Sequence, residues 1–155
     1  MNAPAKSQAS RLESHIGYWL RFVSNHVSAS FRKLLAATGI SVTEWVVLRT
    51  LFDKAPTTHA ELVQELGITK GTASKVISRL EERGLAKRRL ARGRLREQVL
   101  TLTARGKKLV PELCALADQN DALFFGHLHQ HDRTSLINLL RELVSHHQLK
   151  EVPIE

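Results

Sequence analysis

The stretch 41–84 carries three signals for the start of a helix, which restricts this part of the chain to short helices. The signals are hydroxyl side chains suited to cap a first turn, two of them followed three positions later by a glutamate: Ser41 with Glu44, Thr58 with Glu61, and Thr69. Gly67 and Gly84 come where a helix commonly ends in the left-handed conformation. We therefore expect three short helices, the last two spaced as a helix-turn-helix. They cover 41–52, 58–66 and 70–83.

After the third of these helices, the pattern changes to that of two strands joined by a tight turn. We expect the strands over 86–91 and 94–102, with Arg92 and Gly93 in the turn. Because side chains alternate between the two faces of a strand, one face should point into the core. The inward residues should be Leu100 and Leu102, and the outward residues Glu97, Val99 and Thr101.

Three longer segments with the helical spacing of apolar residues flank this unit. They cover 10–37, 103–124 and 131–147. The first should begin with a capping box of Ser10 and Glu13 and end at Gly39. Pro111 should kink or restart the second, because proline lacks the amide that a helix interior uses. The apolar residues of these helices exceed what so small a core can cover. We therefore expect a homodimer, the alternative being terminal helices that fold back on one chain.

Positive charge is concentrated in residues 70–108. This block holds thirteen of the chain's 23 lysines and arginines but only three of its 15 acidic residues. A basic block on a near-neutral body is typical of a protein that binds a polyanion. Its position on a helix-turn-helix and a basic hairpin makes double-stranded DNA the expected partner. Non-specific or architectural nucleic-acid binding is the alternative.

The second helix of a helix-turn-helix places its N-terminal part in the major groove. Basic and hydroxyl side chains there can reach phosphates or base edges, and hairpin arginines can reach an adjacent minor groove. The residues expected to contact DNA are Thr69, Lys70, Thr72, Ser74, Lys75, Ser78, Arg79, Arg88, Arg92, Arg94 and Arg96.

In their order and spacing, these segments resemble the MarR family of bacterial transcription regulators over about residues 12–147. The similarity lies in 42–48, 60–68 and 76–85, and in the run Leu102-Thr103-Ala104-Arg105-Gly106. The resemblance implies a mainly α fold with a small β-hairpin wing, in which a winged helix-turn-helix core is flanked by N- and C-terminal dimerisation helices. It also implies a homodimeric repressor that binds a pseudo-palindromic operator. A small ligand, often aromatic or phenolic, binds between the dimerisation helices and the winged helix of such proteins and releases them from DNA.

This resemblance sets the expected domain organisation. One domain should cover 11–147, and the ends, 1–10 and 148–155, should be flexible. Within the domain, the winged helix-turn-helix should occupy 41–103 and the dimerisation helices 11–38 and 104–147.

The hairpin departs from the family pattern at one position. Members often carry Asp-x-Arg, in which the acid helps to orient the minor-groove arginine. This chain has Arg94-Leu95-Arg96 instead. Without this acid, the orientation of the Arg96 side chain is left open, and the expected binding shifts toward less specific phosphate contacts.

An effector cavity is expected between the first two helices and the winged domain. An aromatic wall with one imidazole or cation suits a carboxylated or phenolic ligand. The candidate lining residues are His15, Tyr18, Trp19, Arg21 and Trp45. Core packing explains the two tryptophans equally well.

The single cysteine and the eight histidines raise the hypotheses of a thiol-redox sensor and a metal sensor. Cys114 lies among apolar residues on a helix, so a packing role is favoured over a reactive thiol. His127 and His131 are spaced to face one side of a helix, yet no cluster of cysteine or glutamate completes a metal site. We therefore expect surface histidines and no bound metal.

Other expectations concern what the chain lacks. It contains no phosphate-binding Gly-rich loop, Gly-x-Ser-x-Gly elbow or HExxH motif, so we expect neither an enzyme nor a cofactor. Residues 1–10 contain no apolar run, so no secretory signal is expected, and no segment approaches the length of a membrane span. With a single cysteine, the expected compartment is the reducing cytoplasm.

Overall fold

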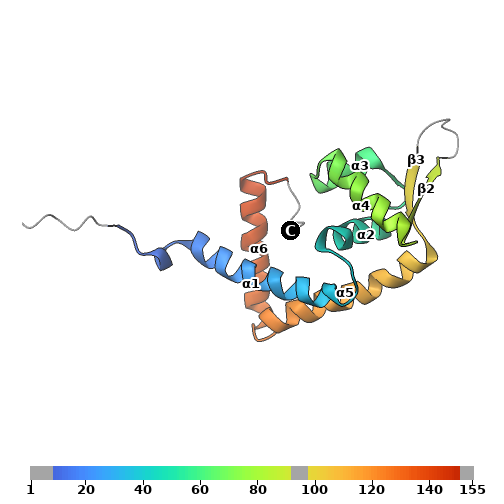
Figure 1. Cartoon of the computed structure of the whole chain (residues 1–155). Helices are drawn as coiled ribbons and strands as arrows, with labels where there is room; N and C mark the ends of the chain where they lie inside the picture. The colour runs from blue at the N-terminus through green and yellow to red at the C-terminus, as the bar shows by residue number, and fades with distance from the viewer. Residues whose placement is uncertain (1–8, 92–97, 151–155) are drawn as a thin grey trace, which may run out of the picture.

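The structure, a computed structural model, describes residues 9–91 and 98–150. The elements in chain order are a 3-10 turn η1 (Leu12–Ser14), α1 (Ile16–Ala36), α2 (Val42–Lys54), β1 (Thr57–Thr58), α3 (His59–Leu66), α4 (Lys70–Glu82), β2 (Ala86–Leu90), β3 (Gln98–Leu102), α5 (Ala104–Phe125) and α6 (Gln130–His146). The fold is mainly helical with a small antiparallel sheet, as predicted. Helices α2, α3 and α4 gather with the sheet at one end, and α1, α5 and α6 extend from them (Figure 1).

The short helices begin at the predicted residues, and α3 and α4 end within one residue of the prediction, whereas α2 continues to Lys54, two residues beyond the predicted end. The capping boxes predicted at the starts of α2 and α3 are both formed. At the start of α4, the Oγ1 of Thr69 accepts a hydrogen bond from the amide of Thr72 at 3.1 Å. Gly67 ends α3 with a φ of 63°, and Gly84 follows α4 with a φ of 67°. Glycine adopts this left-handed region without the steric cost that a Cβ would bring.

The sheet has three strands in the order β1-β3-β2, all antiparallel. Its register pairs Ala86 with Leu102 and Thr57 with Leu100. The sequence did not predict β1, because two residues are too few to display an alternating pattern. The predicted turn at Arg92 and Gly93 lies outside the described residues.

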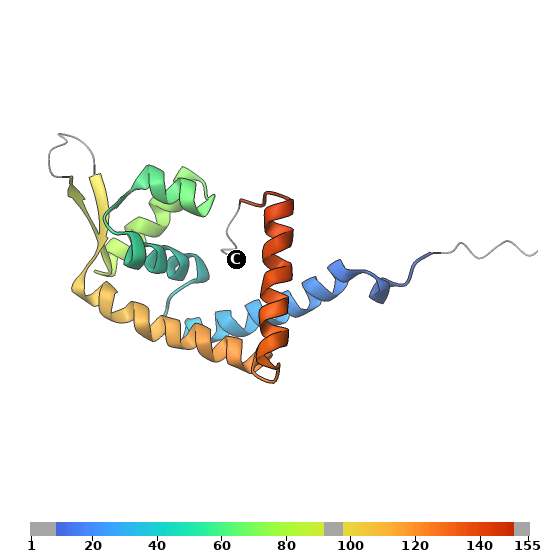
Figure 2. The same cartoon turned by 180° about the vertical axis from the view of Figure 1, so that it is seen from behind.

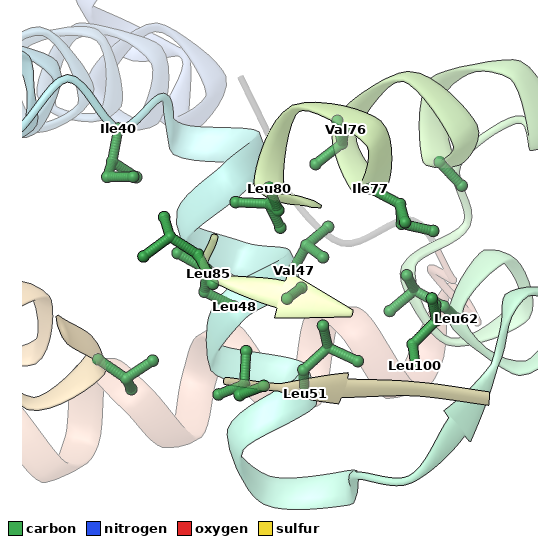
Figure 3. Packing of buried hydrophobic residues seen from close by; sticks show 14 of the residues in the cluster. Ile40, Val47, Leu48, Leu51, Leu62, Val76, Ile77, Leu80, Leu85 and Leu100 are labelled. Atoms are coloured by element: carbon green, nitrogen blue, oxygen red, sulfur yellow. The ribbon is translucent and has the colours of Figure 1, made fainter. Parts of the chain in front are cut away.

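The core forms where α2, α3 and α4 meet the sheet (Figure 3). The apolar side chains on the inner face of α4 are buried there: Ala73, Val76, Ile77 and Leu80. Leu100 and Leu102 are buried, as predicted. The prediction for Thr101 was wrong, because this residue is also buried, with only 8% of its surface exposed. β3 is the middle strand, and α2, α3 and α5 all contact it, which leaves little of it open to solvent.

The predicted start of the first helix was also wrong. α1 begins at Ile16, after His15 in an extended conformation with φ −96° and ψ 124°. The Oγ of Ser10 does not cap Glu13 but lies 3.3 Å from Nε2 of His15. The indole of Trp19 donates to the carbonyl of Glu13 at 2.9 Å, which ties the 3-10 turn to α1. Contacts from beyond the first turn therefore override the local capping signal.

Pro111 does not restart the fifth helix. α5 runs unbroken from Ala104 to Phe125 and crosses α1 in both views (Figures 1 and 2). Val110 and Leu113, on either side of the proline, are fully buried. Packing on both sides thus holds the helix through a residue that lacks a backbone donor.

The terminal helices leave many large apolar side chains exposed. The N-terminal half of α1 extends away from the rest of the chain, and no residue of α6 is buried (Figure 2). The exposed large apolar residues of α1, α5 and α6 are Ile16, Trp19, Leu20, Phe22, Val23, Leu123, Leu136, Ile137, Leu139, Leu140, Leu143 and Val144. An apolar surface of this extent is typical of a protein–protein contact. No helix in the described ranges is both long and apolar enough to cross a bilayer.

Candidate nucleic-acid interface

The outward face of α4 is polar and basic. Its exposed candidate residues are Lys70, Ser74, Lys75 and Arg79, and its half-buried ones are Thr72 and Ser78. Because residues four apart lie on one side of a helix, Lys75 and Arg79 extend from the same surface. The opposite face is packed into the core, so α4 can present only this surface to a partner.

Two threonines define the start of α4. Thr69 lies before the helix, and its Oγ1 is 2.9 Å from the Oγ1 of Thr72. Lys70 and Gly71 follow in the first turn and are exposed. First-turn amides carry partial positive charge and favour an anion such as a phosphate. Because Thr69 caps α4, its hydroxyl is held by the helix, and its role is to fix where the first turn begins.

His59, the first residue of α3, lies beside this surface. Its Nε2 is 3.0 Å from the Oγ of Ser74, so it links the two helices of the helix-turn-helix. His59 is not among the residues that the sequence predicts to contact DNA. The sequence offered one sign that His59 lies near this surface, which is its position directly after the N-cap Thr58. In a helix-turn-helix, the first turn of the first helix lies beside the second helix.

Arg88, predicted to contact DNA, is paired within the chain. Its Nη1 donates to Oε2 of Glu81 at 2.6 Å, and its backbone amide donates to Oε1 of Glu81 at 3.0 Å. Both side chains are partly exposed, 35% for Arg88 and 26% for Glu81. Glu81 thereby joins α4 to the first wing strand. Lys87 and Arg89, the neighbours of Arg88 on β2, are exposed.

The predicted contacts of the hairpin tip lie outside the described residues. They are Arg92, Arg94 and Arg96. β2 ends at Leu90, and β3 begins beside it at Gln98. β2, the strand that precedes this segment in the chain, contacts α4.

The five residues predicted to line an effector cavity do not gather within one chain. Four lie on or beside the N-terminal half of α1: His15, Tyr18, Trp19 and Arg21. Trp45, on α2, packs against Phe31 with 6.4 Å between ring centroids. Phe31 is about 20 Å further along α1 than Tyr18, by the rise of an α-helix. Tyr18 and Trp19 instead contact each other edge to face at 5.1 Å.

The surroundings of Cys114 are those of a packing residue. It is half-buried on α5 and lies against the hydrophobic core. The pKa of Arg49 is raised above its ordinary value, mainly by its hydrogen bond with Asp53 and to a smaller extent by Cys114. Within 9–91 and 98–150, no three histidine, cysteine or acidic side chains are grouped to hold a metal ion.

The helix-turn-helix, the hairpin that follows it and the long helices on either side define a winged helix-turn-helix protein. The family model described as the MarR family matches residues 20–97. The chain belongs to this family.

Its relatives are transcription regulators. The HTH-type transcriptional repressor NicR of Pseudomonas putida is 24% identical over 143 residues, which cover 92% of this chain and 90% of NicR. The transcriptional regulator HosA of Escherichia coli is 26% identical over 102 residues, which cover 66% of this chain and 76% of HosA. The chain therefore belongs to a family of transcription regulators.

Solved structures give the same assignment. Bordetella bronchiseptica BpsR, whose DNA binding is regulated by 6-hydroxynicotinic acid, is 27% identical with a TM-score of 0.76, over 87% of this chain and 96% of the BpsR chain. CouR from Rhodococcus jostii RHA1, solved with bound p-coumaroyl-CoA, has the same TM-score at 23% identity, over 87% of this chain and 95% of its own. The likeness to CouR shows a shared fold.

Proposed function

We propose that this protein is a cytoplasmic, homodimeric repressor that binds a pseudo-palindromic operator in double-stranded DNA. The observation that carries the proposal is the exposed basic face of α4, whose opposite face is buried in the core. In a helix-turn-helix, this second helix enters the major groove. The excess of positive charge over 70–108 supports the same partner, because most of it lies on α4 and the wing.

Each part of the surface has a separate task in this proposal. Lys75 and Arg79 reach into the major groove, where a bidentate arginine–guanine contact contributes about 1–3 kcal/mol of discrimination. Lys70, Thr72, Ser74 and Ser78 bind phosphates or base edges at the start of the groove, and Thr69 sets the first turn. Arg92, Arg94 and Arg96 enter an adjacent minor groove. Arg88 fixes the wing against α4 through Glu81.

A homodimer follows from the exposed apolar faces of α1, α5 and α6. Two chains that cover these faces would present two copies of α4 to one DNA duplex. Half-sites on B-DNA are about 34–36 Å apart, or a multiple of that. A ligand that changes the distance between the two copies of α4 would therefore release the protein from one half-site.

The proposed effector is a small aromatic acid or phenol. BpsR, a structural relative over most of the chain, responds to 6-hydroxynicotinic acid, which makes this compound the first one to test. His15, Tyr18, Trp19, Arg21 and Trp45 remain the residues proposed to bind it. Because Tyr18 and Trp19 are on the exposed half of α1, a second chain is needed to enclose them.

The proposal is tested by selecting bound fragments from genomic DNA and measuring their affinity against random DNA at one salt concentration. We expect the selected operator to bind about a thousandfold more tightly or better, and 6-hydroxynicotinic acid or a related acid to weaken that binding. A palindromic footprint with two half-sites would support the dimer.

A second candidate function is non-specific or architectural DNA binding. The observation in its favour is Arg94, which stands where family members often have an aspartate. A ratio near one between operator and random DNA would favour this candidate and exclude specific repression.

A further inference from the structure

Arg83, the residue that directly follows α4, makes its side-chain polar contacts with the segment that joins α1 to α2. Its Nη1 donates to the carbonyl of Gly39 at 2.7 Å, and its Nη2 donates to the carbonyl of Thr38 at 3.2 Å. Its side chain keeps about a third of its surface exposed. The two terminal nitrogens of the guanidinium thus donate to the carbonyls of two successive residues, which precede Arg83 by more than forty positions in the sequence.

Those carbonyls belong to the turn that follows the C-terminal end of α1 at Ala36. Carbonyl oxygens in a turn accept hydrogen bonds, and a guanidinium can donate to two of them at once. Thr38 and Gly39 close this end through amides that donate to Leu35 and Ala36. Gly39 has a φ of 69°, and a Cβ at this position would lie 3.4 Å from Nη2 of Arg83. The turn after α1 therefore lies in van der Waals contact with the guanidinium.

A buried carboxylate lies beside the same guanidinium. Glu44 has only 7% of its side chain exposed, and its Oε2 is 3.9 Å from Nη1 of Arg83. The same Oε2 accepts the amide of Ser41 at 2.8 Å in the capping box of α2. Because a buried charge needs a nearby counter-charge, Arg83 also connects α4 to the start of α2.

The backbone of Arg83 makes a link to the other long helix. Its carbonyl accepts a hydrogen bond from Nη1 of Arg105, in the first turn of α5, at 3.3 Å. One residue at the end of α4 therefore contacts the turn after α1, the start of α2 and the start of α5.

We propose that Arg83 is a positioning residue that couples the DNA-binding helix α4 to the terminal helices α1 and α5. A displacement of α1 relative to α5 then pulls on the end of α4 and changes its orientation on DNA. This regulation of the DNA-binding surface rests on the function proposed above, but the coupling itself can be measured without DNA.

The direct test is the distance between α1 and α4 within one chain. Nitroxide labels are placed at Lys33→Cys and Lys75→Cys in a Cys114→Ser background, and the labelled protein is diluted with an excess of unlabelled protein. Arg83→Met keeps an unbranched side chain but removes every donor. We expect it to widen the distribution of label distances at least twofold, and Arg83→Lys to restore part of the original width. Lys108→Ala, which removes an exposed base from α5, serves as control and should leave the width unchanged.

Equal widths in the wild type and Arg83→Met would overturn the proposal. If circular dichroism shows that Arg83→Met does not fold, the comparison is made between the wild type and Arg83→Lys. In that comparison we expect a wider distribution for the lysine variant, and equal widths would again overturn the coupling.

The functional readout uses the selected operator and a copy with one base pair inserted between its half-sites. The wild type should prefer the original spacing, and Arg83→Met should reduce that preference at least threefold. An unchanged preference would overturn the role of Arg83 in orienting α4. If no specific operator is found, the proposed function fails, whereas the label distances still decide whether Arg83 couples the helices.

Discussion

The carboxylate of Glu81 holds Arg88 twice, through the guanidinium at 2.6 Å and through the backbone amide at 3.0 Å. Glu81 is in the last turn of α4, and Arg88 is in the middle of β2. The contact between Glu81 and Arg88 therefore fixes β2 against α4, and Glu81 is an acidic residue within a strongly basic surface. This carboxylate joins the two elements that are proposed to contact DNA, although its charge by itself would repel DNA.

Glu81→Ala should weaken operator binding by about threefold to tenfold, since one charge-assisted and partly exposed contact contributes on the order of 1 kcal/mol. Its neighbour Glu82 is exposed, so Glu82→Ala is the matched control. Removing a negative charge by itself favours DNA binding, and the control should bind equally well or slightly better. Fluorescence anisotropy with a labelled operator measures both variants. Tighter binding by Glu81→Ala would contradict the positioning role.

Arg96→Ala should weaken operator binding and lower the salt slope by about one, as expected when one phosphate or minor-groove contact is lost. Arg11→Ala removes the same charge near the start of the chain, where Arg11 lies 4.0 Å from Glu13, and should change neither quantity. Binding is measured over a series of salt concentrations. Equal effects from the two substitutions would mean that the wing does not contact DNA.

Ile137→Glu should convert the proposed dimer to monomers, because it places a charge on the apolar face of α6, where Ile137 is 46% exposed in the single chain. Operator affinity should fall at least a hundredfold, since one half-site would be lost. Asn138→Glu, at the next position on the same helix, is the control. Light scattering gives the mass of each variant, and a dimeric Ile137→Glu would place the contact elsewhere.

Gly106→Ala should destabilise the fold by about 3 kcal/mol or more, because the added Cβ would lie 2.0 Å from the carbonyl of Leu85. The same change at Gly17, where nothing lies within 4 Å, should stabilise α1 by about 0.5–1 kcal/mol. Urea denaturation at one protein concentration compares the two. Equal free energies of unfolding for the two variants would mean that α5 can move away from Leu85 without loss of stability.

Local rules predicted much of the fold, because a capping box needs only residues within one turn. The helices that begin after Ser41, Thr58 and Thr69 start at the predicted residues. The rule failed at Ser10, where the side chains of His15 and Trp19 determine the backbone instead. Thr101 was misplaced for a similar reason, because its burial depends on helices that are distant in sequence.

The candidate site was predicted in part. Exposure of Lys75 and Arg79 follows from helical periodicity, which a sequence displays directly. The pairing of Arg88 with Glu81 requires the turn at Gly84 to bring β2 back along α4. The contact of Arg83 with Thr38 joins residues far apart in the sequence, so no local pattern could reveal it.

Thr103 is the one residue between the last residue of β3, Leu102, and the first of α5, Ala104. Its hydroxyl accepts from the amide of Gly106 at 3.0 Å and donates to the carbonyl of Gly84 at 2.7 Å. An extra residue at this junction would rotate everything downstream by about 100° about the helix axis. Side chains that now lie inward would turn toward water. We therefore expect an inserted or deleted residue to be poorly tolerated at this junction and better tolerated where no rigid element follows so closely.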